Sequence, residues 1–147
     1  NGTIKTALNS IHDESHHPKN LLDYFDSNCY KSNNDGNATI IFDFIIKSVK
    51  LSCYSIKSCS SNSNGAQLKN WVVEVSDNGQ KWIEIDHHAN DSKLKEPNAI
   101  QTFIIQQPKN DFYRFVRIGQ TGSSSLFSSY LTLCSIELYG KLKSPLK

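Results

Sequence analysis

Runs of β-branched and aromatic residues alternate with turn residues along the whole chain, and this pattern constrains the fold most strongly. The clearest two runs, residues 71–76 and 81–86, flank an Asn78-Gly79 pair. Such a pair predicts a tight hairpin, because both residues tolerate a positive φ. Six further runs cover residues 3–8, 39–46, 49–57, 100–106, 112–119 and 130–140. Eight short strands, with a helical turn expected only over residues 18–25, predict an all-β antiparallel sandwich or barrel.

The connections between these runs differ in length in a regular way. If successive strands run in opposite directions, as in a jelly roll, the connections alternate between the two ends of the sandwich. The long connections then share one end, and they cover residues 9–38, 58–70, 87–99 and 120–129. The tight connections share the other end, and they cover residues 47–48, 77–80 and 107–111. Because loops on a rigid scaffold commonly carry binding groups, we predict that the long-loop end is the functional surface.

The length of 147 residues, with 37% hydrophobic side chains, suits one domain with a buried core and is too short for two. We expect this domain to span residues 1–140. Residues 141–147, which include Pro145, are expected to form a linker or tail. Methionine is absent, so we expect the sequence to be a piece of a longer polypeptide.

The charge of the chain argues against nucleic acid as a partner, and its hydropathy argues against a membrane-spanning segment. The formal net charge is only +2, and two of the sixteen basic residues are arginines, so the concentrated basic face of a nucleic-acid binder is not expected. No apolar run approaches the roughly 18 residues that span a bilayer, and no signal peptide opens the chain.

Four segments, taken together and in order, resemble the discoidin domain, also called the coagulation-factor five/eight C-type domain. They are residues 41–44 (IFDF), 68–86 (LKNWVVEVSDNGQKWIEID), 112–122 (FYRFVRIGQTG) and 136–140 (IELYG). The variant nearest in wording is the one joined to BTB domains in intracellular proteins. The resemblance implies an eight-stranded, galactose-binding-like jelly-roll sandwich without catalytic activity. It also implies binding of glycans, phospholipid head groups or proteins through loops at one end.

The cysteines and the apolar loop residues depart from the secreted and membrane-binding members of that family. The first strand lacks the cysteine that commonly closes the domain in secreted members, and the nearest late cysteine, Cys134, lies within a strand pattern. Cys29, Cys53, Cys59 and Cys134 are therefore expected to be free thiols, and the protein to be intracellular, with the extracellular surface as the alternative. The loops offer Tyr30, Leu126 and Phe127 among polar residues, which is little apolar area for membrane binding.

The preferred hypothesis is a non-enzymatic module that docks a partner protein through its long loops, within a multidomain chain or a large, for example cytoskeletal, assembly. The alternative is lectin-like binding of galactose-type glycans by the same loops, which offer amide, carboxylate and aromatic groups. The predicted ligand-binding residues are Asn28, Tyr30, Asn33, Asp35, His87, Phe127 and Tyr130.

Neither catalysis nor a cofactor is expected. The sequence contains no GxSxG turn and no glycine-rich phosphate loop. His12 and His16 are four residues apart, but Pro18 and the polar surroundings argue against the helix that a zinc pair would need. Calcium, held by loop carboxylates, is the weaker alternative to no cofactor, since the loops contain no dense acidic cluster.

Two tryptophans and two arginines lie in or beside the predicted strands. Trp71 shares a face with Val73 and Val75 and is expected in the core, whereas Trp82 faces the other way. Arg117 is expected to pair with a carboxylate such as Asp43 or Glu137 in a structural role. Arg114 is expected to be exposed.

Overall fold

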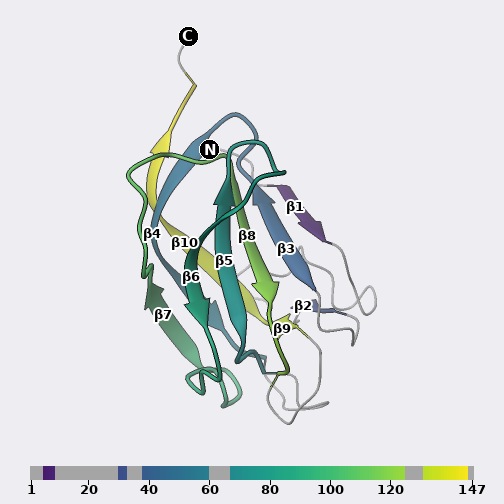
Figure 1. The fold of residues 1–147 in the computed structure, drawn as a ribbon. Coiled ribbons are helices and arrows are strands. Elements are labelled where there is room, and N and C mark those ends of the chain that lie inside the picture. Colours follow the sequence, from purple (N-terminus) through teal and green to yellow (C-terminus); the bar gives the residue numbers. More distant parts are fainter. Residues whose placement is uncertain (1–4, 9–29, 33–37, 60–66, 125–130, 146–147) are drawn as a thin grey trace.

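The computed structural model describes residues 5–8, 30–32, 38–59, 67–124 and 131–145 (Figure 1). In these residues the chain forms ten strands and no helix. The strands are arranged in three antiparallel groups: a five-stranded sheet, a three-stranded sheet and a two-stranded ribbon. The expected helical turn over residues 18–25 lies outside the described residues.

The five-stranded sheet has the order β1-β3-β8-β5-β6. Its members are β1 (Lys5–Leu8), β3 (Thr39–Asp43), β8 (Phe115–Gln120), β5 (Trp71–Ser76) and β6 (Ile83–His88). The three-stranded sheet has the order β10-β4-β7. Its members are β10 (Ser135–Lys143), β4 (Ser48–Lys57) and β7 (Ile100–Ile104).

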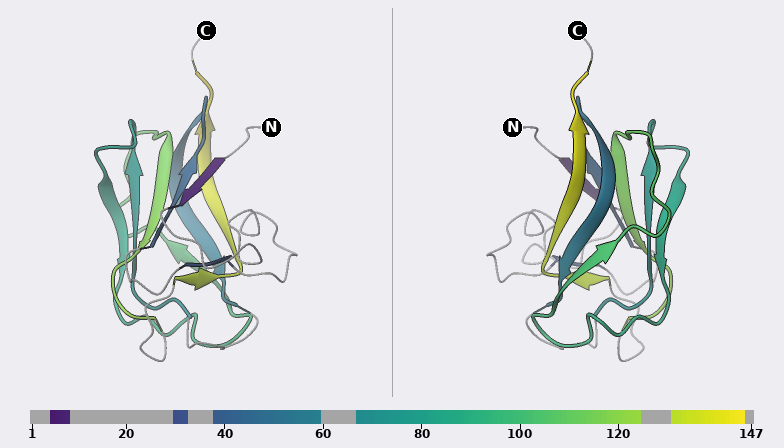
Figure 2. Two further views of the ribbon diagram at one scale, coloured as in Figure 1. Left: turned by 90° about the vertical axis from the view of Figure 1, so that its right-hand side faces the viewer. Right: turned by 90° about the vertical axis from the view of Figure 1, so that its left-hand side faces the viewer.

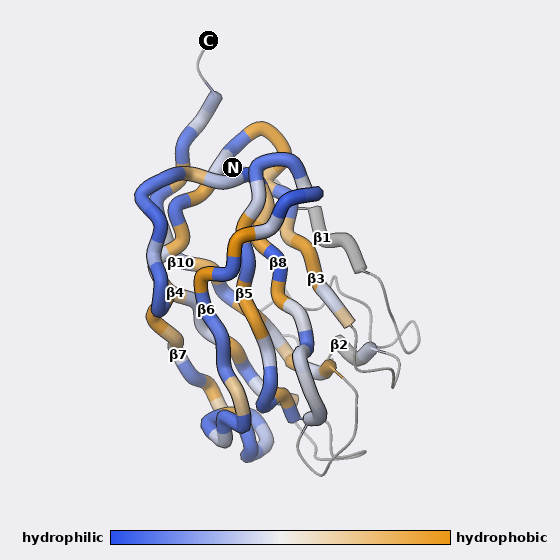
Figure 3. The backbone as a smooth tube through the Cα atoms, in the orientation of Figure 1, coloured by the Kyte–Doolittle hydropathy of each residue, from blue (hydrophilic) through white to orange (hydrophobic). Residues whose placement is uncertain are grey.

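The two sheets lie face to face (Figure 2), so the predicted eight-stranded jelly-roll sandwich is confirmed. The core between them consists of inward-facing side chains from both sheets. Ile40 and Phe42 on β3, Trp71 on β5, and Tyr54 and Ile56 on β4 are fully buried. Figure 3 shows the matching pattern, with apolar residues on the strands and polar residues over most connections. Trp71 is therefore a core residue, as predicted.

Strand boundaries differ from the sequence pattern at the end of the chain. The run 130–140 is divided into β9 (Thr132–Leu133), which pairs with β2 (Tyr30–Lys31), and β10, which continues to Lys143. The division falls at Cys134, whose backbone N–H donates to the carbonyl of Lys57, 2.7 Å away. Two-residue strands such as β2 and β9 carry too few residues to show an alternating pattern.

The hairpin between β5 and β6 differs from the tight turn that Asn78-Gly79 predicts. Of these two residues, only Gly79 has a positive φ, 73°. The Asn78 side chain instead accepts the backbone N–H groups of Gln80 and Lys81, at 2.8 and 3.0 Å. The connection therefore spans residues 77–82, because side-chain bonds to the backbone replace the two-residue turn.

The strand register shows which connections share an end. Trp71, where β5 begins, is paired with His88 and Gln120, where β6 and β8 end. We call this the loop end; its described connecting residues are 32, 38, 58–59, 67–70, 89–99, 121–124 and 131. The opposite end, which we call the turn end, carries residues 44–47, 77–82 and 105–114. The predicted sharing of ends is confirmed for the strands that bound these connections (Figure 1), but the connection 105–114 was predicted to be tight and is nearly as long as the connection 89–99.

The first and last strands both reach the turn end. Lys5 of β1 is paired with Asp43 of β3, and Lys143 of β10 is paired with Ser48 of β4. Since one short connection, residues 44–47, joins β3 to β4, the two outer strands flank the same turn.

Candidate functional site

Asn70 ties three connections of the loop end together. Its side-chain carbonyl accepts the backbone N–H of Asn90 at 2.8 Å, and its amide donates to the carbonyl of Ser123 at 2.7 Å. Its own backbone carbonyl accepts the N–H of Thr121 at 3.1 Å. One residue that immediately precedes β5 thus fixes the starts of the loops that follow β6 and β8.

The loop between β6 and β7 is also attached to the end of β4. Ser58 exchanges backbone and side-chain hydrogen bonds with Ala99, and its hydroxyl donates to the carbonyl of Glu96 at 2.6 Å. The N–H of Asn98 donates to the carbonyl of Cys59 at 3.0 Å. The described part of the rim is therefore preorganised by bonds between segments that are distant in sequence.

A buried chain of polar side chains lies beneath this rim. The Trp71 indole N–H donates to the Tyr54 hydroxyl at 2.8 Å, and that hydroxyl donates to Asp86 Oδ2 at 2.5 Å. The His88 ring lies between two carboxylates, with Nε2 2.8 Å from Asp86 Oδ2 and Nδ1 2.8 Å from Asp91 Oδ2. Burial, followed by the hydrogen bond to Asp86, raises the pKa of Tyr54. We call these five residues the polar chain.

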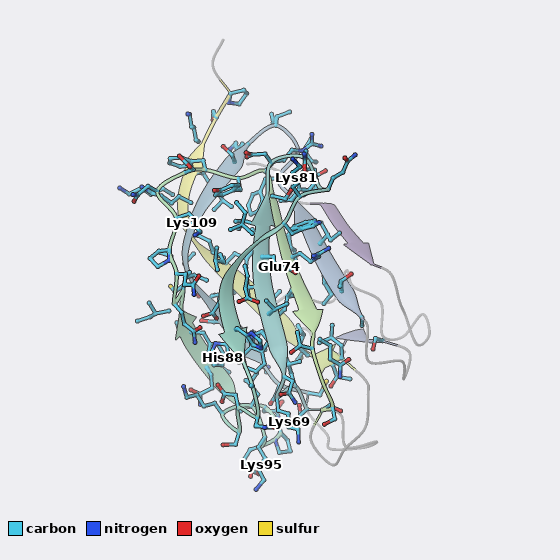
Figure 4. All side chains as sticks on the ribbon, viewed as in Figure 1. Lys69, Glu74, Lys81, His88, Lys95 and Lys109 are labelled. Atoms are coloured by element: carbon cyan, nitrogen blue, oxygen red, sulfur yellow. The ribbon has the colours of Figure 1, made fainter. Side chains whose placement is uncertain are left out.

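The packing of His88 gives it a structural role. Its ring stacks on Trp71 with centroids 4.3 Å apart, and its side chain is 11% exposed. Phe103 covers the ring edge-on, with centroids 4.8 Å apart. Both ring nitrogens already face carboxylates, so the imidazole is fully occupied in positioning Asp91 and the loop that contains it. Figure 4 shows His88 within the lower part of the sandwich.

Of the predicted ligand-binding residues, His87 alone has a described side chain. It is exposed on β6, and its Nδ1 lies 3.6 Å from Glu84. It points away from His88, as expected for neighbours on a strand. Tyr30 lies on β2, where its backbone is paired with Leu133, and its side chain is outside the described set. Outside it as well are Asn28, Asn33, Asp35, Phe127 and Tyr130.

Sequence reasoning missed Asn70 and His88, which organise the rim. In the sequence, the signal for Asn70 was its position as a polar residue directly before a buried strand. The signal for His88 was its position on the same face as Asp86, two residues earlier on β6. Neither signal identifies the partner, because the bonded residues come from other strands and loops.

Arg117 pairs with a carboxylate, as predicted, but neither of the two suggested partners was right. Its guanidinium binds Glu74 at 2.9 Å, whereas Asp43 binds the exposed Arg114 at 2.7 and 3.0 Å. Glu74 and Arg117 are directly opposite each other on β5 and β8, a register that the sequence alone did not give. Arg117 also lies 4.1 Å from the ring centroid of Trp82, which covers this pair.

Three further observations bear on the predicted classes. Cys53 is a free, partly exposed thiol, while Cys59 and Cys134 are buried. No group of three or more His, Cys, Asp or Glu side chains is placed to hold a metal ion within the described residues. The same part of the chain contains no helix with the length and hydropathy of a membrane span.

Comparison with known proteins gives relatives in both sequence and structure. Over 128 residues the chain is 30% identical to E3 ubiquitin-protein ligase hecd-1 of Caenorhabditis elegans, a match covering 85% of this chain and 5% of that protein. CBM32-3 from a family 31 glycoside hydrolase of Clostridium perfringens superposes with a TM-score of 0.75 at 12% identity, covering 94% of this chain and 91% of the other.

A second structure from Clostridium perfringens, CpGH89CBM32-5 in complex with GalNAc-β-1,3-galactose, gives a TM-score of 0.73 at 11% identity, covering 93% of this chain and 95% of the other. At these identities the two structures establish the fold alone. The family model of the F5/8 type C domain matches residues 5–133, which is most of the chain. The chain therefore belongs to the F5/8 type C, or discoidin, domain family.

Proposed function

We propose that this domain is a non-catalytic binding module that docks a partner protein through its loop end, as one part of a larger intracellular polypeptide. The observation that carries the proposal is the set of hydrogen bonds that join the described loops to one another at the loop end. Asn70, Ser58 and the polar chain hold the described loops in one arrangement, which lowers the entropy lost on docking.

The side chains that the described rim presents favour a protein over a sugar. Lys93, Lys95 and Glu96 are exposed, and they suit charged contacts with another protein surface. Sugars are commonly held against an exposed aromatic face. The aromatic rings described at this end, Trp71 and Phe103, are buried at 0% and 3% exposure.

The sequence relative supports a docking role within a long chain. The chain spans 5% of the length of hecd-1, whose name describes a ubiquitin ligase. A small, rigid, non-catalytic domain in such a polypeptide suits recruitment of a protein, either a substrate or another part of an assembly. The same relationship supports the intracellular location that we propose.

A paired charge reversal tests this proposal. Proteins that cross-link to the intact chain in lysate of its source organism are quantified, and one that is enriched is purified and titrated against the chain. We expect Lys93→Glu with Lys95→Glu to weaken that titrated binding by roughly tenfold. The control, Lys81→Glu at the turn end, is an exposed position outside both proposed binding surfaces, and it is expected to leave the titrated binding unchanged. Equal loss in both variants contradicts docking at the loop end.

Glycan binding is the second candidate, and the fold match to a domain solved with GalNAc-β-1,3-galactose favours it. It is tested by calorimetric titration of the chain with that disaccharide and with galactose, in calcium and in EDTA. Millimolar or tighter binding that Tyr30→Ala or Asp35→Ala abolishes would make the glycan the primary ligand. Loss of that binding in EDTA would in addition support a calcium ion held by loop carboxylates.

A further inference from the structure

The turn end contains a hollow of about 520 Å³ that the loop-end function does not use. It lies on the three-stranded sheet beside a gap in the hydrogen bonding of β4. Val49 is bonded to Tyr113 in both directions at 2.8 Å, and the carbonyl of Ser52 accepts the N–H of Ile105 at 3.0 Å. Between Val49 and Ser52 the connection from β7 to β8 moves away from β4. Residues of β4 and residues of that connection together line the hollow.

Both lysines and apolar residues line this hollow. Leu51, Ile105 and Pro108 line it together with Lys50, Lys109 and Lys141. Lys50 and Lys141 are directly opposite each other on β4 and β10, an arrangement that repulsion between like charges disfavours. A structural role does not explain this pairing, since the described residues that line the hollow include no carboxylate to neutralise it.

The basic surface continues past Phe112 into a second hollow of about 360 Å³, which Lys47 and Lys143 line. The Phe112 ring joins the two hollows, because Lys50 Nζ lies 5.5 Å and Lys143 Nζ 5.7 Å from its centroid. Arg114 also lines the second hollow, but Asp43 already binds it. We call these two hollows with their five lysines the lysine groove.

The charge of the lysine groove is a local property. The whole chain carries a formal net charge of only +2, so carboxylates elsewhere balance most of its lysines. No ion pair involves Lys47, Lys50, Lys109, Lys141 or Lys143 within the described residues. These ammonium groups are therefore available to an external anion.

A β-bulge sets the position of Lys141 in this groove. The register between β10 and β4 shifts between Tyr139 and Gly140, which places Lys141 opposite Lys50. Gly140 lies so close to β4 that a Cβ at this position would be 2.1 Å from the carbonyl oxygen of Lys50. Bulges commonly redirect a side chain at a binding site, and here the bulge places Lys141 opposite Lys50, where both line the hollow.

We propose that the lysine groove binds a short acidic peptide segment of a partner protein. Carboxylates of the peptide face Lys50, Lys109 and Lys141, and an apolar side chain rests on Pro108 and the exposed Ile104. A volume of this size holds a few side chains and suits a peptide better than a flat surface. The groove is a second site, at the opposite end from the proposed docking rim.

Two other anionic partners fit the groove less well. The described apolar side chains that protrude at this end, Ile46, Ile104 and Leu142, are 67%, 79% and 56% exposed, and they lie on three separate segments, which gives little insertion into a lipid surface. Nucleic acids favour the bidentate fork of arginine, and the one arginine here is held by Asp43. A hollow lined by lysines and apolar residues is complementary to acidic residues spaced around an apolar one.

The test is a fluorescence anisotropy titration of the chain with a fluorescein-labelled peptide of glutamates and leucines. Its control peptide has glutamine in place of glutamate. We expect the acidic peptide to bind, the glutamine peptide not to bind, and binding to weaken as salt increases. Lys50→Glu with Lys141→Glu is expected to weaken binding by roughly tenfold or more, whereas Lys93→Glu with Lys95→Glu leaves it unchanged.

Lys109→Glu provides a second test outside the sheet, in case the paired reversal within β4 and β10 disturbs folding; it too is expected to weaken binding. Three results would overturn the proposal: no binding of the acidic peptide at low salt, equal loss in the loop-end variant, or tighter binding of phosphatidylserine vesicles or duplex DNA through the same lysines. Each leaves the docking proposal unaffected, because that proposal depends on the residues of the other end.

Discussion

The hairpin between β5 and β6 at the turn end and the loops at the other end are held in shape by different kinds of side-chain hydrogen bond. At the turn end, Ser76 and Asn78 bond to backbone N–H groups two and three residues away. At the loop end, Asn70 bonds to residues that lie 20 and 53 positions away. The β5–β6 hairpin at the turn end is therefore largely shaped by its local sequence, whereas the described loop end is shaped by bonds between segments that are distant in sequence.

The difference extends to backbone strain. At the turn end, Ile45 has a φ of 64°, a conformation that costs a β-branched residue about 1–3 kcal/mol. The Asp43 side chain offsets part of that cost by accepting the N–H of Ile45 at 2.8 Å. At the loop end, positive φ values fall on Asn90 and Asn98, which tolerate them well. The local bond from Ile45 to Asp43 thus holds a strained turn. The unstrained loops of the other end depend on bonds to residues distant in sequence, such as those of Asn70.

The largest effect is expected from breaking the polar chain beneath the loop end. Asp86→Ala leaves the Tyr54 hydroxyl, the His88 ring and the N–H of Gln106 without their shared carboxylate. We expect a loss of about 4 kcal/mol in the free energy of unfolding, measured by urea denaturation. The exposed Asp77 at the turn end is the control, and Asp77→Ala should change stability by less than about 0.5 kcal/mol. Similar losses in both variants would remove the distinction between the two ends.

A large effect at the other end is expected from Gly140→Ala. The added Cβ would meet the Lys50 carbonyl at 2.1 Å, so β4 and β10 must separate locally. We expect a loss of about 3 kcal/mol in the free energy of unfolding. Lys141→Ala, one residue further on an exposed position, serves as the control and should be nearly neutral. A neutral Gly140→Ala variant would show that the bulge is more adaptable than its geometry indicates.

Measurements at alkaline pH should reveal how much the protonated Tyr54 contributes to the free energy of unfolding. Because burial and Asp86 raise the pKa of Tyr54 in the folded protein, the unfolded chain loses this proton first, near pH 10. The stabilisation is thus complete below pH 10 and declines as pH rises further, by at most about 1.4 kcal/mol per pH unit. Urea denaturation between pH 9 and 11 should give a shallower decline for Tyr54→Phe than for the unsubstituted chain. Equal slopes would contradict a protonated, buried Tyr54.

The smallest of these effects is expected for Asn70→Ala. It removes two side-chain bonds to loop backbone, so the free energy of unfolding should fall by about 1 kcal/mol. The informative measurement is hydrogen exchange, which should quicken at Asn90 while the turn-end amides of Gly79 and Lys81 are unchanged. Uniform quickening at both ends would mean that the ends are not independently held.

The same contrast explains what could be predicted from sequence. The strands and the separation of long from short connections follow from alternating side chains and turn residues, which are local properties. The pairing of Glu74 with Arg117 could not be predicted, because it depends on the register between β5 and β8. The polar chain escaped prediction for the same reason, since Tyr54, Trp71 and His88 come from three strands that are brought together only in the folded sandwich.

The convergence of β1 and β10 on one turn has a consequence for how such a domain can be built into other proteins. Lys5 and Lys143 are paired with Asp43 and Ser48, which are separated by a single short connection. A domain whose first and last strands flank one turn can be inserted into a surface loop of a host fold without forcing the two ends of that loop far apart. The module would then stand out from its host with its long loops pointing outward, and the lysine groove would lie close to the junction.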